Sequence, residues 1–193
     1  MFLLARPPEE QVRRFLAEQR DLPFSYAGVG ASRGTPPRGY NVDHYRVRLG
    51  AGREAFERAA AALRRWEMFD LGWVRLCWPD TPIVAGAAVG VVIRLFGLWS
   101  LNSARIVYVI DESGPPIWRY GFAYGTLPGH AERGEERFSV EWRQDDDSVW
   151  YDLFAFSRPS HVLARIGYPL TRVLQKRFAR DSRAAMVRAV NRR

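Results

Sequence analysis

Apolar residues recur at helical spacing in two segments of the first third of the chain. Val12, Phe15 and Leu16 share one face of a segment that follows two prolines, which predicts a first helix ending near Asp21–Pro23. Residues 52–69 repeat this spacing, and their many alanines also favour a helix. The apolar positions of that second face are Phe56, Ala59, Ala60, Leu63, Trp66 and Met68. Two helices are therefore expected before residue 70.

Strands are predicted by alternating or continuous apolar runs between these helices and after them. Residues 24–40 indicate a short strand and a loop, and residues 40–50 indicate a half-buried strand. Residues 82–101 contain glycines and Arg94, so they predict two short strands joined by a turn and not a membrane span. Residues 104–112 are apolar on both faces, which predicts a central strand covered on both sides.

Three antiparallel strands are predicted within residues 117–156, joined by two turns. The first strand places Trp118, Tyr120, Phe122 and Tyr124 on one face and small residues on the other. Glycine and alanine opposite large aromatic residues permit close backbone approach and bending. A curved sheet is the expected result.

The last 36 residues combine an apolar stripe with arginines and predict a basic amphipathic helix. Ser160 is the expected N-cap, and the helix should end near Val190. Gly167 and Pro169 interrupt the pattern, so a kink or break is expected there, with a candidate gate between them. The stripe consists of Val162, Leu163, Ile166, Leu170, Val173, Leu174 and Phe178.

These elements predict an α+β fold in one domain spanning residues 1–193. Residues 1–24 form an N-terminal helical segment, residues 25–157 a sheet with the inserted helix 52–69, and residues 158–193 the C-terminal helix. Strands followed by a long amphipathic helix favour a curved antiparallel sheet wrapped around that helix, a helix-grip layout. Side chains often fill the space inside such a sheet only in part, so we expect a cavity there.

Composition and charge limit the partners that the chain can have. The net charge is +8, and residues 158–193 hold ten of the 29 basic residues with one of the 21 acidic ones. Clustered arginines are compatible with nucleic-acid binding. The same helix has an apolar face, however, and no recognised nucleic-acid motif accompanies it, so a solvated helix face is favoured and a nucleic-acid partner is not expected.

The cysteine content bears on the compartment. Cys77 is the single cysteine and cannot form an internal disulfide, which favours a reducing, cytoplasmic location. Its apolar neighbours Leu76 and Trp78 predict an unreactive thiol. The N-terminus lacks the pattern of a signal peptide. Nearly all basic residues are arginine, which indicates a GC-rich bacterial genome.

Candidate chemistry is concentrated in the polar turn of residues 125–136. His130 and Glu132 could form an acid/base pair or supply metal ligands, but a solvated hairpin loop has the same composition. We favour the loop, and we expect neither a metal nor a cofactor. Asp152 lies within an apolar strand, where a carboxylate needs a partner such as Arg119 or Arg137. If Asp152 instead lines the cavity, it becomes a candidate acid.

Aromatic residues on the predicted strands supply the candidate ligand contacts. They serve equally well as core, and the two interpretations stay open. Tyrosines stand out because each buried hydroxyl needs a partner. The residues expected to contact a ligand are Tyr120, Phe122, Tyr124, Phe138, Tyr151, Phe154 and Tyr168. No phosphate loop, dinucleotide fingerprint or nucleophile elbow occurs, which disfavours nucleotide-dependent enzymes and serine hydrolases.

Three stretches carry a resemblance to a known family. They read YGFAYGTLPGHAERGEERFSVEW, VWYDLFAFSRP and LARIGYPLTRVLQKRFARDS. From about Tyr26 to Met186 the chain resembles the bacterial and plant family known as domain of unknown function 1990. That family looks akin to the helix-grip superfamily of birch-pollen-allergen, lipid-transfer and polyketide-cyclase proteins. The resemblance implies a hydrophobic-ligand pocket and carries over no catalytic residue.

The sequence thus favours a binding module that holds a small apolar or amphipathic molecule between the sheet and the last helix. The first alternative is a cyclase- or hydrolase-like enzyme that uses His130, Glu132 or Asp152 with a tyrosine. The second alternative is an interaction protein that binds nucleic acid or another partner through its basic helix. The oligomeric state stays open.

Overall fold

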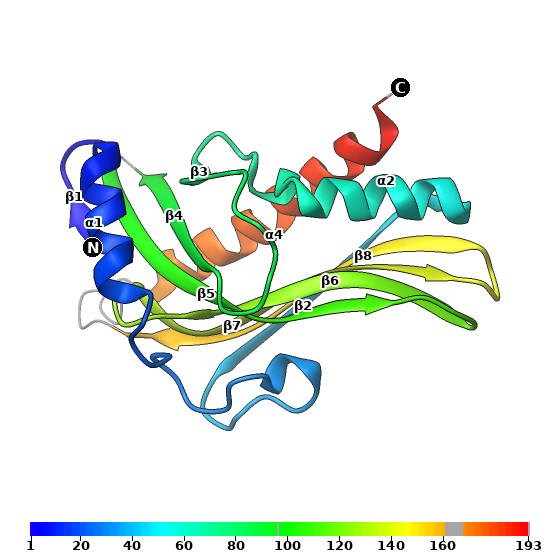
Figure 1. Cartoon of the computed structure of the whole chain (residues 1–193), viewed down its shortest axis with the longest axis horizontal. Coiled ribbons are helices and arrows are strands. Elements are labelled where there is room, and N and C mark those ends of the chain that lie inside the picture. Colours follow the sequence, from blue (N-terminus) through cyan, green and yellow to red (C-terminus); the bar gives the residue numbers. More distant parts are fainter. Residues whose placement is uncertain (96, 161–167, 193) are drawn as a thin grey trace.

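The computed structural model describes residues 1–95, 97–160 and 168–192. Within these residues the strands form one eight-stranded antiparallel sheet (Figure 1). The strands are β1 (Phe2–Leu3), β2 (Asn41–Ala51), β3 (Val74–Leu76), β4 (Ala88–Leu95), β5 (Leu98–Glu112), β6 (Ile117–Thr126), β7 (Glu132–Arg143) and β8 (Ser148–Pro159). Their order is β2-β8-β7-β6-β5-β4-β3, and β1 pairs with the start of β5. The three strands predicted within residues 117–156 are confirmed.

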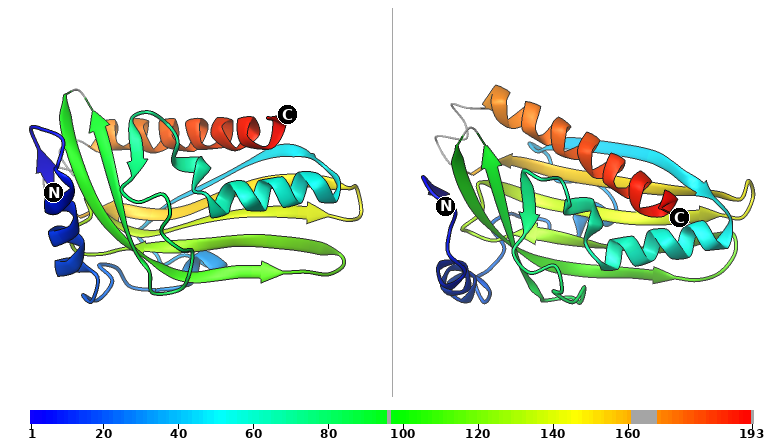
Figure 2. Two further views of the ribbon diagram at one scale, coloured as in Figure 1. Left: turned by 45° about the horizontal axis from the view of Figure 1, so that its top comes forward. Right: turned by 90° about the horizontal axis from the view of Figure 1, so that it is seen from above.

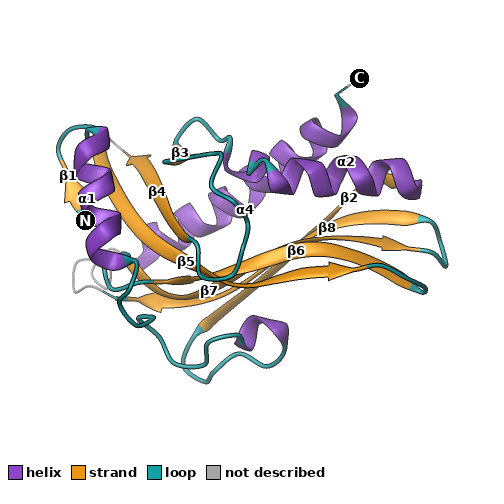
Figure 3. Ribbon diagram, viewed as in Figure 1, coloured by secondary structure: helices purple, strands orange, loops and turns teal. Residues whose placement is uncertain are grey.

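The sheet curls because its long strands are bent. The register between β5 and β6 shifts between Ile106 and Tyr108, and the register between β2 and β8 shifts between Arg48 and Gly50. Such bulges bend a strand and increase its twist. The first half of β5 therefore turns away with β4, while its second half stays with β6 (Figure 3).

β5 was predicted to be central and covered on both faces. It lies between β4 and β6, an inner position of the sheet. Ile106 is fully buried, whereas Val109 and Ile110 towards the far end are only half-buried. The strand is therefore internal to the sheet, but its side chains become less buried towards its far end.

The helices follow the apolar pattern closely. They are α1 (Glu9–Gln19), α2 (Gly52–Arg64) and α4 (Tyr168–Asn191), with short 3-10 turns η1 (Ala31–Arg33) and η2 (Glu67–Phe69). The predicted apolar faces of α1 and of the 52–69 segment are buried. That second helix stops earlier than expected because Trp66 has a left-handed backbone, with φ of 57°, which ends α2 and starts η2.

The concave face of the sheet is covered by α2 and α4, which cross its two halves (Figure 2). Alanines of α2 let that helix lie close to the strands, and Ala59, Ala62 and Leu63 are fully buried. The second half of α4 packs in the same layer through Ala185, Met186 and Val190. The curled antiparallel sheet wrapped around a C-terminal helix is the α+β fold expected from the sequence.

The other face of the sheet is covered by the segment between α1 and β2. A short strand was predicted there, and this prediction is wrong, because residues 24–40 contain only the turn η1 between loops. The carboxylate of Glu135 holds the segment instead. It accepts hydrogen bonds from the Tyr26 hydroxyl at 2.6 Å and from the amides of Gly30 and Ser32 at 2.7 and 3.0 Å. The segment is thus held to the sheet by hydrogen bonds to the Glu135 side chain and not by pairing as a strand.

The start of the C-terminal segment is described only in part. Ser160 donates its hydroxyl proton to the backbone carbonyls of His130 and Ala131, so in the described residues it fastens the β6–β7 turn. The helix α4 begins at Tyr168 and ends at Asn191, close to the expected end. The expected stripe positions Val162, Leu163 and Ile166, the gate at Gly167 and the side chain of Tyr168 lie outside the described residues.

Candidate functional site

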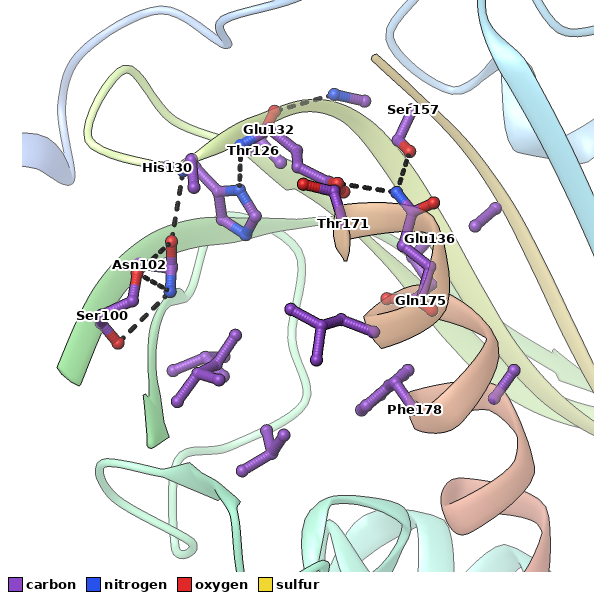
Figure 4. A pocket seen from close by; sticks show the side chains of 18 of the residues that line it. Ser100, Asn102, Thr126, His130, Glu132, Glu136, Ser157, Thr171, Gln175 and Phe178 are labelled. Atoms are coloured by element: carbon purple, nitrogen blue, oxygen red, sulfur yellow. Dashed lines mark hydrogen bonds between the residues drawn. The ribbon is translucent and has the colours of Figure 1, made fainter. Parts of the chain in front are cut away.

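A cavity of about 570 Å³ lies between the first half of α4 and the curled sheet, and β2 and β4 to β8 all contribute to its lining (Figure 4). Most of its wall is apolar. The apolar lining residues include Phe69, Trp73, Val74, Val91, Ile93, Leu153, Leu174 and Phe178. Leu98 on β5 and Leu170 on α4 also line it and are 48% and 45% exposed. The cavity is therefore accessible to solvent at this rim.

The cavity exists because the helical cover differs between the two halves of the sheet. Over one half, the small side chains of α2 pack tightly on the strands. Because α2 ends at Arg64, the first half of α4 covers the other half of the sheet without a second long helix beside it (Figure 2). Side chains from β4, β5 and η2 form walls there but do not fill the space.

Polar side chains converge at the inner end of this cavity (Figure 4). Glu132, at the start of β7, accepts a hydrogen bond from the Gln175 amide of α4 at 2.6 Å. The same amide reaches the Ser157 hydroxyl of β8 at 2.9 Å. Burial raises the pKa of Glu132 above its usual value, although Gln175 and Ser157 act in the opposite direction. One helix residue thus links β7 and β8 across the cavity.

Glu136 is the second inward-facing carboxyl of β7. It accepts a hydrogen bond from the Tyr124 hydroxyl of β6 at 2.7 Å. Burial in the apolar cavity raises the pKa of Glu136 to about 8, and the nearby charges of Glu132 and Asp43 add to this effect. At neutral pH Glu136 is therefore mostly protonated, and it can both donate and accept hydrogen bonds.

His130 lies in the β6–β7 turn with its ring on the cavity side (Figure 4). Its Nδ1 accepts the backbone N–H of Glu132 at 3.0 Å, which leaves the proton of the neutral ring on Nε2. Burial lowers the pKa of His130 to about 4. The turn is fixed by Gln19 of α1, whose side-chain oxygen accepts the Gly129 amide at 2.7 Å. His130 is thus a positioned neutral donor.

The remaining charged pair at this end joins α4 to β2. Both terminal nitrogens of Arg172 donate to the carboxylate of Asp43, at 2.5 and 2.7 Å. Two parallel bonds of this kind fix the side chains more firmly than a single contact does. The pair holds the first half of α4 above the cavity.

Three of the residues singled out from the sequence meet in the cavity wall: Tyr124, His130 and Glu132. Four of the aromatic candidates lie on the same face of the sheet, in the packed core beyond the cavity. They are Tyr120, Phe122, Phe138 and Tyr151. The Tyr151 hydroxyl is hydrogen-bonded to the Ser182 hydroxyl of α4 at 2.8 Å, so it has a structural partner.

The structure places Asp152 and Phe154 on the opposite face of β8, away from the cavity. Asp152 accepts hydrogen bonds from Arg137 at 3.0 Å and pairs with His44 at 2.6 Å and Arg46 at 3.3 Å. Of the two partners proposed for it, Arg137 is present. Arg119 instead pairs with Glu112 and Glu141. Phe154 packs edge-on against His44.

Sequence reasoning missed several cavity residues. Glu136 had a usable signal, because it alternates with Glu132 and Phe138 on the same face of β7. Gln175 lies three residues before Phe178, which belongs to the apolar stripe expected from the sequence, so the two side chains share one face of the helix. Trp73 carried no signal, since it lies in a loop whose position depends on the whole fold.

Cys77 does not belong to the described lining of the cavity. Burial raises the pKa of the Cys77 thiol to about 12, so the thiol stays protonated. In the part of the chain that the structure describes, no three His, Cys, Asp or Glu side chains are grouped to hold a metal ion. No helix in that part is long and apolar enough to cross a membrane.

Several arginines of the basic helix are engaged within the protein. Arg177 stacks on Trp73 and pairs with Asp181, while Arg183 lies over the ring of Tyr45. Arg180 also pairs with Asp181. These contacts support a structural role for part of the positive charge that the sequence concentrates in α4.

Comparison with known proteins identifies close sequence relatives. A sequence model described as "Domain of unknown function (DUF1990)" matches residues 25–185. A UPF0548 protein of Deinococcus radiodurans is 42% identical over 201 residues, covering 98% of both chains. A UPF0548 protein of Dictyostelium discoideum is 35% identical over 207 residues, covering 98% of this chain and 96% of the relative. Relatives therefore occur in eukaryotes as well as in bacteria.

Solved structures with similar folds are much more distant in sequence. Human STARD10 aligns with a TM-score of 0.50 at 11% identity, covering 95% of this chain and 81% of that one. Truncated norcoclaurine synthase from Thalictrum flavum aligns with a TM-score of 0.47 at 11% identity, covering 83% and 99%. At these identities the likeness concerns the helix-grip fold alone.

Proposed function

This chain belongs to the DUF1990 family, a domain of unknown function, and we propose that it is a binding module that holds one small apolar or amphipathic molecule. The observation that carries this proposal is the cavity of about 570 Å³, apolar along its walls and polar at its inner end. Small-molecule sites have this size and this combination of apolar walls with a few convergent polar groups. The cytoplasm is the proposed setting, because a single cysteine gives no disulfide.

The packing supports a ligand more than a purely structural gap. Protein interiors are close-packed, and an unfilled apolar space forfeits the contacts of its lining atoms. Here two aromatic rings, Trp73 and Phe178, line such a space. A bound apolar chain or ring would restore those contacts while its polar group reaches Tyr124, Glu136 or His130.

Native mass spectrometry of protein purified without detergent tests this proposal. We expect a non-covalent adduct of a few hundred daltons that denaturation releases. The control is Ala155→Phe, which places a phenyl ring into the cavity from β8. The adduct should be lost in this variant. Absence of an adduct on the native wild-type protein, or the same adduct on Ala155→Phe, would contradict the binding function.

An enzyme of the cyclase or hydrolase kind is the second candidate, because proton-carrying groups converge inside the cavity. Glu136 is a protonated acid near pH 7, and His130 presents an N–H to the cavity from the β6–β7 turn. A general acid works best when its pKa lies near the working pH. In this alternative Glu136 donates a proton to the substrate and Tyr124 positions the carboxyl group.

The same mass spectra separate the two candidates when Glu136→Gln is included. Glutamine keeps the shape of the side chain and cannot donate an acid proton. A binding module should retain the same molecule in the wild type and in Glu136→Gln. An enzyme should accumulate its substrate in Glu136→Gln, so the two adducts would differ in mass.

A further inference from the structure

Carboxyl groups gather at the inner end of the cavity. Three acidic side chains point into it, Asp43, Glu132 and Glu136, and the described lining contains no lysine or arginine. Arg172, beside the cavity, is bonded to Asp43 through both terminal nitrogens. Glu135 also belongs to the wall, but its carboxylate binds Tyr26 and Ser32 on the opposite face of the sheet.

The two remaining carboxyl groups have only neutral hydrogen-bond partners among the described residues. Glu132 accepts from the Gln175 amide at 2.6 Å, and Glu136 accepts from the Tyr124 hydroxyl at 2.7 Å. Neither forms an ion pair with a described residue. This is notable in a chain with 29 basic residues and a net charge of +8. A buried carboxyl group with no cation beside it among the described residues tends to keep its proton, and a cationic ligand would supply the charge that lets it ionise.

We propose that the ligand of this cavity is an amphiphile with a protonated amine, which pairs with Glu136 while its apolar part lies against Trp73 and Phe178. This inference rests on the proposed binding function and names the class of ligand. Glu132 adds a second carboxyl group at the same end, and the aromatic ring of Tyr124 borders the amine position. Amines bind well where carboxylates and aromatic rings meet.

The change in protonation of Glu136 on binding gives a measurable signal for this inference. The groups around Glu136 are Tyr124, Tyr151, Glu132 and Asp43, and the acidic ones all disfavour its ionised form when the cavity is empty. Pairing with an ammonium group favours the ionised form, so Glu136 releases its proton to solvent when the amine enters. Binding near pH 7 should therefore release up to about one proton, and amine affinity should rise between pH 6 and pH 8.

The experiment compares three probes with the same chain and different head groups: decylamine, decanol and decanoate. Each is titrated into the full-length protein at pH 7.5 by isothermal titration calorimetry, in two buffers of different ionisation enthalpy. We expect decylamine to bind about tenfold more tightly than decanol, and decanoate to bind most weakly. Proton release should accompany decylamine alone.

Two variants locate the effect. Glu136→Gln should weaken decylamine about tenfold, abolish the proton release and leave decanol unchanged. Glu57→Gln, on the exposed side of α2 in an ion pair with Arg53, is the matched control and should leave all three affinities unchanged. An amine preference that survives in Glu136→Gln would overturn the inference.

The outcomes also separate this inference from the function on which it rests. If decanol or decanoate binds as tightly as decylamine, the amine class is overturned and the binding function stands. If none of the three probes binds the wild-type protein, the binding function fails and the amine class fails with it.

Discussion

Glu136 and His130 face the same cavity, and burial shifts their pKa values in opposite directions. The pKa of Glu136 rises to about 8 and that of His130 falls to about 4, because a poorly solvated site disfavours the charged form of each group. Both are therefore neutral at pH 7. An acid O–H and an imidazole N–H then face any molecule in the cavity.

The raised pKa of Glu136 predicts a specific pH dependence of stability. The folded protein keeps this proton up to about pH 8, whereas the unfolded chain releases it near the ordinary value of 4.5. Between these limits the folded state binds more protons, so the free energy of unfolding falls as pH rises. Water in the open cavity reduces the effect, and we expect Glu136 to account for about 2 kcal/mol between pH 5 and pH 8.5.

Urea unfolding of Glu136→Gln measures this contribution. The variant should lose about 2 kcal/mol less than the wild type between pH 5 and pH 8.5, and it should be the more stable protein at pH 8.5. Glu57→Gln should follow the wild type. Parallel pH profiles for the wild type and Glu136→Gln would show that Glu136 is ionised in the empty cavity.

The sequence alone pointed to some of the individual residues that line the cavity. Tyr124, His130 and Glu132 were singled out, and all three line the cavity. Glu136 was not, although strand alternation places it on the face of Phe138. Alternation gives the face but not the position along it, and so it could not separate Tyr124 from Tyr120, which lies in the core. Which of the two tyrosines lines the cavity depends on how β5, β7 and α4 pack together.

At the scale of elements, the segment between α1 and β2 shows why the residue pattern alone wrongly predicted a strand. Residues 24–40 resembled a short strand and a loop because glycine alternates with small residues there before a Pro-Pro-Arg-Gly turn. In the fold the Glu135 carboxylate accepts hydrogen bonds from the Tyr26 hydroxyl and from two backbone amides of this segment. The Tyr26 ring packs over Gly125 and against Phe156. The structure of this segment therefore depends on Glu135, a side chain about one hundred residues away in sequence. The pattern of residues within the segment gives no indication of that contact.

Glu135→Gln tests this anchor. The amide group offers one acceptor oxygen in place of two, so at least one of the buried donors loses its partner. We expect the free energy of unfolding to fall by about 2–3 kcal/mol and amide hydrogen exchange at Gly30 and Ser32 to accelerate. Glu54→Gln, 90% exposed on α2, is the control and should change neither. A variant as stable as the wild type would mean that packing of Tyr26 alone holds the segment.

The C-terminal helix has two structural roles along its length. Its second half packs as core through Met186 and Val190, while its first half forms the roof of the cavity through Leu174, Gln175 and Phe178. The amphipathic pattern predicted the helix and part of its inner face: Leu170, Leu174 and Phe178 line the cavity, whereas Val173 of the expected stripe is exposed. It could not predict that only the first half covers an open space, since that depends on where α2 ends.

Over the whole molecule, curvature of the sheet and the short α2 together produce the cavity. The sequence predicted the α+β class, the curved sheet and the final helix because these follow from periodicity and from small residues on β6. The location of the cavity follows from long-range packing, and the ligand would be chosen by its inner polar end. The account therefore depends on one claim, that this space admits a small molecule.

Titration with N-phenyl-1-naphthylamine, an uncharged dye that fluoresces in apolar surroundings, tests that claim most directly. We predict one saturable site per chain in the wild type. Ala155→Phe should raise the dissociation constant at least about tenfold, because its ring occupies the cavity. Ala17→Phe, which adds the same ring on the exposed face of α1, should bind like the wild type. Absence of saturable binding, or equal binding by Ala155→Phe, would contradict the account.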